Sequence, residues 1–116
     1  MGAPMMTLWL GQDGFDYAFQ CDYQRLWTDE VEGIAEVAGH DTDCPISIEY
    51  KPNEPRSYSL LRDAATTLLA IEEAGRNNLG VTIDFAHALY ADEQPANAAA
   101  MVMRRSRLLG LHLNDG

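Results

Sequence analysis

The sequence predicts an α/β fold of parallel βα units that form about half of a (β/α)8 barrel. Short aliphatic segments of strand type alternate with amphipathic helical segments, and this order is typical of a parallel sheet with right-handed crossovers. A four-stranded parallel sheet with helices on one face has two open edges and one bare face. This arrangement suits part of a barrel better than a finished small domain.

The expected strands alternate aliphatic and polar residues. In the second one, Ile46 and Ile48 alternate with Ser47 and Glu49. The proline-rich segment 52–55 then prevents any strand or helix from continuing. We expect strands near residues 7–11, 45–50, 79–84 and 111–114.

The expected helices begin and end at residues that favour helix termini. Asp22 is an N-cap for the first helix, Gly75 ends the second, and Pro95 suits the first turn of the third. Apolar residues such as Val31 and Ile34 recur at spacings of three and four, which indicates one buried face. We expect helices near residues 23–38, 59–74 and 95–109, all within a single partial-barrel domain over residues 1–116.

Composition excludes several classes of protein. Hydrophobic residues make up 47% of the chain, which excludes a disordered protein. A formal net charge of −10 repels phosphate backbones and anionic lipids, so we expect neither nucleic acid nor a membrane as partner. Cys21 and Cys44 form no metal-type spacing and no disulfide framework, and the N-terminus does not have the pattern of a signal peptide. We therefore expect a cytoplasmic location.

Three of the expected strands carry a metal-capable side chain on the same face. Because side chains alternate along a strand, Glu49, Asp84 and His112 lie opposite the aliphatic residues and near the carboxyl ends. Active sites of (β/α)8 barrels lie at these ends. Two carboxylates and one imidazole suit a divalent ion, Mn²⁺ or Mg²⁺, with Co²⁺ and Zn²⁺ as alternatives. His87 and Asp115 are close enough in sequence to reach the same site, where they would hold a second ion or a substrate hydroxyl.

Each of these residues also has an ordinary structural interpretation. An aspartate at a strand end, such as Asp84, is more often a turn or helix cap. Trp9 can be a core residue, and Lys51, the only lysine, can form an exposed ion pair with Glu49. The recurrence of metal-capable residues at equivalent strand positions favours the metal site.

Four segments resemble the xylose isomerase-like TIM-barrel superfamily. Segment 49–56 resembles the Glu-x-Lys-Pro-Asn-Glu-Pro-Arg loop of xylose isomerases, and this match is specific. Segments 8–14, 84–87 and 112–115 resemble the flanking strand ends of the superfamily. The order Glu, Asp, His is closer to the L-rhamnose isomerase branch than to xylose isomerase itself.

The resemblance implies a metal-dependent aldose–ketose sugar isomerase, an intramolecular oxidoreductase that acts on a monosaccharide. It implies that Glu49, Asp84 and His112 bind a structural metal ion and that His87 binds a second, mobile one. It also implies that Lys51 holds and polarises the carbonyl oxygen of the substrate.

By the same resemblance, Trp9 lines an apolar wall beside the sugar. The superfamily has a further carboxylate ligand on strand eight, whereas this chain matches strands four to seven. We therefore expect a fragment of a barrel that is inactive alone and that associates as a homo-oligomer to cover its edges.

Three other functions stay open. One is a sugar epimerase of the same superfamily, in which a carboxylate moves a proton. Another is an apurinic-site endonuclease-like metal enzyme, which the charge of −10 disfavours. The last is a non-catalytic, truncated assembly partner.

Overall fold

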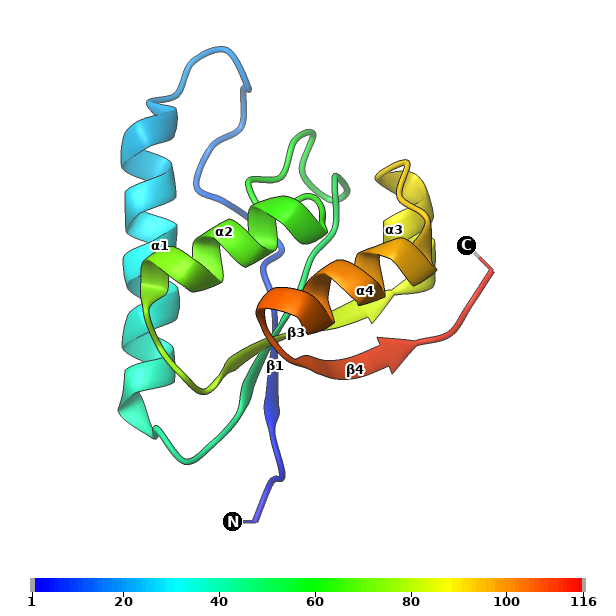
Figure 1. Cartoon of the computed structure of the whole chain (residues 1–116). Coiled ribbons are helices and arrows are strands. Elements are labelled where there is room, and N and C mark those ends of the chain that lie inside the picture. Colours follow the sequence, from blue (N-terminus) through cyan, green and yellow to red (C-terminus); the bar gives the residue numbers. More distant parts are fainter. Residues whose placement is uncertain (1, 116) are drawn as a thin grey trace.

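The computed structural model describes residues 2–115 and contains one four-stranded sheet with helices between its strands. The spatial order of strands is β1-β2-β3-β4, and every neighbouring pair is parallel (Figure 1). The strands are β1 (Met6–Trp9), β2 (Ile46–Glu49), β3 (Leu79–Asp84) and β4 (Leu108–His112). The helices are α1 (Tyr23–His40), α2 (Ala64–Ala74), α3 (Phe85–Tyr90) and α4 (Pro95–Arg105). The expected parallel α/β partial barrel is confirmed.

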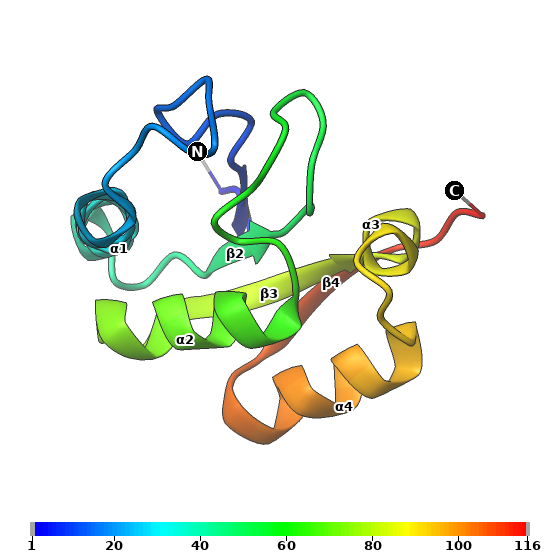
Figure 2. The same cartoon turned by 90° about the horizontal axis from the view of Figure 1, so that it is seen from above.

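The helices cover one face of the sheet. Figure 2 shows α2 and α4 on the same side of the strands, and residues of α1 belong to the same apolar core. The two central strands, β2 and β3, pack their aliphatic residues against these helices. The core includes Val31, Ile34, Ala38, Ile46, Ile48, Ala70, Val81, Ile83 and Val102.

The second helix begins later than the sequence predicts. It starts at Ala64, not near residue 59, because Asp63 and Thr66 form a capping box. The Asp63 carboxylate accepts a hydrogen bond from the Thr66 N–H at 2.8 Å, and the Thr66 hydroxyl accepts one from the Asp63 N–H at 3.3 Å. The preceding residues instead form the long loop after β2.

The fourth strand was expected at the wrong residues. It runs from Leu108 to His112, and the helix before it ends at Arg105. Gly110, which directly follows the expected end of that helix at residue 109, lies inside β4 opposite Thr82. A Cβ added to it would meet the Thr82 hydroxyl at 2.7 Å. Leu113, inside the range expected for this strand, lies beyond the end of β4 and is 73% exposed.

The short helix α3 was not expected at all. It follows β3 directly, because the Asp84 side chain accepts a hydrogen bond from the His87 N–H and so caps it. The opposite face of the sheet, away from the core, has small polar side chains at its centre. There the Ser47 and Thr82 hydroxyls share a buried hydrogen bond of 2.5 Å.

Strands β1 and β4 form the two edges of the sheet within the described residues. Large apolar side chains are exposed on them or just beyond, at Met6, Trp9, Leu111 and Leu113. Association with a second copy, expected from the sequence, would cover these edges and stays a prediction. No helix within residues 2–115 has the length and apolar character needed to cross a membrane.

Candidate metal centre

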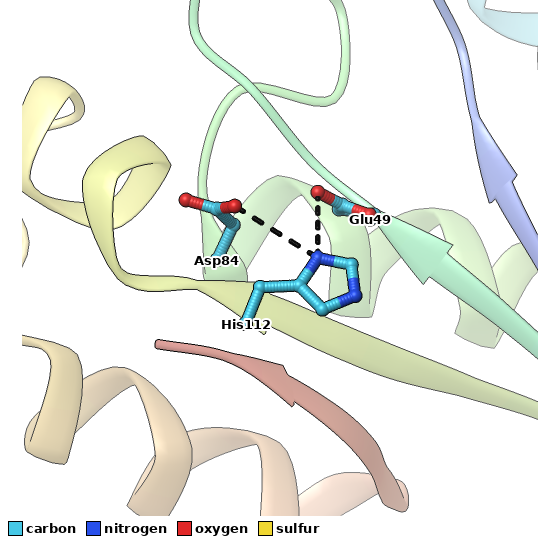
Figure 3. Close-up of side chains that lie close together, drawn as sticks. All are labelled: Glu49, Asp84 and His112. Carbon is cyan, nitrogen blue, oxygen red and sulfur yellow. Dashed lines mark hydrogen bonds and ion pairs between the residues drawn. The ribbon is translucent and has the colours of Figure 1, made fainter. Parts of the chain in front are cut away.

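Three metal-capable side chains meet at the carboxyl ends of adjacent strands. Glu49 ends β2, Asp84 ends β3 and His112 ends β4, where it pairs directly with Asp84. Each residue offers one ligand atom, and the three atoms all lie within 4.8 Å of one another (Figure 3). The structure thus brings together the three residues that strand alternation selected. Their binding of a metal ion stays a prediction.

The donor set fits a divalent cation. The His112 Nδ1 lies 3.3 Å from Glu49 Oε1 and 3.8 Å from Asp84 Oδ2. An ionised carboxylate only accepts hydrogen bonds, so a proton on Nδ1 is donated to Glu49, and a cation bound by the same three atoms would replace that proton. The side chains of Glu49 and Asp84 are 10% and 11% exposed, whereas that of His112 is 53% exposed. The two carboxylates are therefore mostly buried, whereas the imidazole side of the site is open to solvent.

Asp84 is held in its ionised form. Burial by itself would raise the pKa of Asp84, but hydrogen bonds from the His87 N–H and the Asn114 side chain outweigh burial and lower it below its ordinary value. The carboxylate accepts from His87 N at 3.1 Å and from Asn114 Nδ2 at 3.1 Å to each oxygen. Asp84 is thus both a helix cap and a candidate ligand, so its two interpretations are compatible.

His87 lies beside the three-residue group but is not part of it. Its Nδ1 is 3.1 Å from the Tyr50 carbonyl oxygen and 3.5 Å from Glu49 Oε1. A carbonyl oxygen can only accept, so the hydrogen-bond network assigns the proton to Nδ1 and leaves the Nε2 lone pair of a neutral ring free. The expected binding of a second ion or of a substrate hydroxyl by His87 stays a prediction.

The remaining candidates line the same end of the sheet or lie near it. Lys51 Nζ is 3.6 Å from Glu54 Oε2 and 5.8 Å from the centre of the Trp9 ring. The lysine therefore pairs with Glu54 and not with Glu49. No role was expected for Glu54. Trp9 is 45% exposed and is not a core residue. Asp115 is exposed and does not belong to the group of three.

A buried ion pair anchors the two loops that border the site. Arg56 Nε lies 2.9 Å from Asp13 Oδ2, and the two side chains are only 3% and 1% exposed. Asp13 also accepts from the Leu60 N–H at 3.0 Å, and Arg56 donates to Ser59 and, at 3.4 Å, to the Lys51 carbonyl. The loop after β1 is thereby tied to the loop after β2.

Sequence reasoning missed Asp13 and Asn114. The ion pair of Asp13 with Arg56 joins two irregular loops, for which no periodic pattern exists. Asn114 had a usable signal, because it stands two residues after His112, at a spacing that places side chains on the same side of an extended segment.

No protein-family model matches the chain. Among solved structures, it is similar to a D-tagatose 3-epimerase-like protein, with a TM-score of 0.72 and 20% identity over 97% of this chain and 42% of that one. It is also similar to a D-psicose 3-epimerase studied in the presence of D-fructose, with a TM-score of 0.70 and 22% identity over 92% of this chain and 37% of that one. The chain thus spans about two fifths of the length of these structures. The chain therefore has the fold of part of a TIM barrel.

Proposed function

We propose that this chain carries the metal centre of a divalent-metal-dependent sugar epimerase that acts next to the carbonyl group of a ketose. The observation that supports this most strongly is the convergence of Glu49, Asp84 and His112 from three adjacent strand ends. The fold shared with two solved structures named as 3-epimerases, or as like them, favours an epimerase over an isomerase.

The residues of the site suit the chemistry of such an enzyme. A bound divalent ion would polarise the carbonyl and hydroxyl oxygens of the sugar. Glu49, Asp84 and His112 would hold that ion. The ion pairs of Glu49 use Oε1, so its Oε2 is the candidate to accept a proton from the carbon beside the carbonyl. His87, through Nε2, would bind a neighbouring hydroxyl.

The aldose–ketose isomerase predicted from the motif is the second candidate. It is favoured by Lys51, whose ammonium group lies beside Trp9 at the same end of the sheet. In that reaction Lys51 would hold the carbonyl-end oxygen of the sugar, and a hydride would move between neighbouring carbons. Glu54 would have to release Lys51, and this ion pair is weak because Glu54 is 78% exposed.

Binding of Mn²⁺ tests the metal centre. We expect weak binding by the 116-residue chain, in the millimolar range, because three protein ligands face an open side. Mn²⁺ should broaden the NMR signals of residues 48–50, 83–87 and 111–113. Glu49→Gln should lower the affinity at least about tenfold, because it removes a charged ligand but keeps the shape. Glu72→Gln, at an exposed position on α2, is the matched control. Equal affinities of the Glu49→Gln variant and the wild type would contradict the proposed site.

Solvent deuterium exchange separates the two candidate reactions. Epimerisation through proton transfer needs a group on each face of the carbon, but exchange of its hydrogen needs only one base. With Mn²⁺ and D-fructose in D2O, we therefore expect slow deuterium incorporation at C3, measured by NMR, and its loss in Glu49→Gln. Formation of an aldose without deuterium uptake would favour the isomerase instead.

A further inference from the structure

Asn114 is placed to control the geometry of the metal centre without touching the ion. We propose that Asn114 is a positioning residue that fixes the carboxylate of Asp84. This inference rests on the proposed metal function. The Asn114 Nδ2 donates to both oxygens of Asp84, each at 3.1 Å, and its Oδ1 accepts from the Ala86 N–H at 2.8 Å.

The orientation of the Asn114 amide follows from its partners. The backbone N–H of Ala86 can only donate, so the carbonyl oxygen of the Asn114 side chain must face it. The NH2 group then faces Asp84, whose ionised carboxylate can only accept. Both ends of the amide are matched, and a flipped side chain would oppose donor to donor and acceptor to acceptor.

These contacts restrict rotation of the Asp84 carboxylate. The His87 N–H donates to Oδ1, and the Asn114 amide donates to both oxygens. The carboxylate plane is thus fixed from two sides, by α3 and by the segment after β4. Oδ2 is thereby kept 3.8 Å from the His112 Nδ1, on the side where the ligand atoms meet. Hydrogen-bonding partners of metal ligands commonly change metal affinity by about 10–100-fold when they are removed.

Asn114 also fixes two ligands relative to each other. The ladder between β3 and β4 ends at the pair of Asp84 and His112. Beyond it, the bonds from Asn114 to Asp84 and Ala86 hold the chain that follows β4 against the start of α3. Without Asn114, the end of β4 that carries the exposed His112 would lose its connection to α3 and would rely on the sheet ladder and on the contact of His112 with Glu49.

The test compares Asn114→Ala with the adjacent variant Leu113→Ala in the 116-residue chain, with Mn²⁺ as the probe and NMR line broadening as the readout. We expect Asn114→Ala to weaken Mn²⁺ binding about tenfold. Leu113→Ala, at a residue that is 73% exposed, should bind Mn²⁺ within twofold of wild type, about the error of the titration. Thermal unfolding of both variants reports any general loss of stability.

The outcomes separate this inference from the proposed function. Weaker binding in Asn114→Ala, with a melting temperature like that of Leu113→Ala, supports a positioning role, because a purely structural residue would not lower affinity at constant stability. Wild-type affinity in Asn114→Ala overturns the positioning role and leaves the metal centre intact. Absence of Mn²⁺ binding by the wild type overturns the metal centre and the inference together.

Discussion

Replacing Arg56 by methionine should lower the free energy of unfolding by about 3–5 kcal/mol. The Arg56 guanidinium and the Asp13 carboxylate are almost fully buried, 2.9 Å apart. Methionine keeps much of the volume but leaves the Asp13 carboxylate buried without its cation. Such a loss is a large fraction of the 5–15 kcal/mol that stabilises a typical domain. Urea unfolding at pH 7, followed by circular dichroism, measures it.

An exposed ion pair of α1 provides the matched control. Arg25 Nε lies 3.8 Å from Asp29 Oδ2, with side chains 80% and 63% exposed, so Arg25→Met should cost less than about 0.5 kcal/mol. Adding Asp13→Asn to Arg56→Met should recover part of the stability, because the buried charge is then gone. Similar costs for Arg56→Met and Arg25→Met would show that the buried pair contributes little.

The parts of the fold that the sequence predicted are those governed by periodic patterns. The alternation of Ile46 and Ile48 with polar residues identified β2 and the face to which Glu49 belongs. Asp22 was expected to cap α1, and its carboxylate accepts from the Arg25 N–H at 3.2 Å. The start of β4 was predicted too late because glycine commonly ends helices. Gly110 instead lies within the strand, where the absence of a side chain allows close approach to Thr82.

The candidate site was predictable to the extent that it depends on strand geometry. Parallel strands bring their carboxyl ends to one edge, so Glu49, Asp84 and His112 could be grouped without coordinates. Contacts made by loops follow no such rule. The ion pair of Lys51 with Glu54 depends on the irregular path of the loop after β2, and the sequence offered only Glu49 as an ionic partner for this lysine.

A second long-range contact near the site could not be predicted from the sequence either. The Tyr50 hydroxyl donates to Glu93 Oε2 at 2.5 Å, and Glu93 Oε1 accepts from the Ala64 N–H at 2.8 Å. Burial and this hydrogen bond raise the pKa of Tyr50, which keeps the hydroxyl protonated. Tyr50, which lies between Glu49 and Lys51, is thereby connected to the start of α2 through Glu93, which is 43 positions away in the sequence.

Glu30 on α1 should make stability depend on pH between about pH 4.5 and 7. Both of its carboxylate oxygens are buried without a hydrogen-bond partner among the described residues, as is Nη1 of Arg56. Burial raises the pKa of Glu30 from 4.5 to about 7; the Asp13 carboxylate adds to the rise, and Arg56 partly offsets it. The folded protein therefore binds this proton more tightly than the unfolded chain does. The resulting stabilisation is complete below pH 4.5 and is lost as the pH rises to about 7.

Glu30→Gln removes this titration, since glutamine stays neutral at every pH. Relative to the wild type, the variant should gain about 2–3 kcal/mol of unfolding free energy between pH 4.5 and pH 8, a value reduced for the partial exposure of Glu30. Urea unfolding at several pH values measures the unfolding free energy of both proteins. Subtracting the wild-type value from that of the variant cancels the titration of all other groups. Glu32→Gln, at an exposed position of the same helix, should differ from wild type by a nearly constant amount. A pH-independent difference for Glu30→Gln would mean that Glu30 is ionised in the folded protein at its ordinary pKa, because water or the unpaired Nη1 of Arg56 then solvates it.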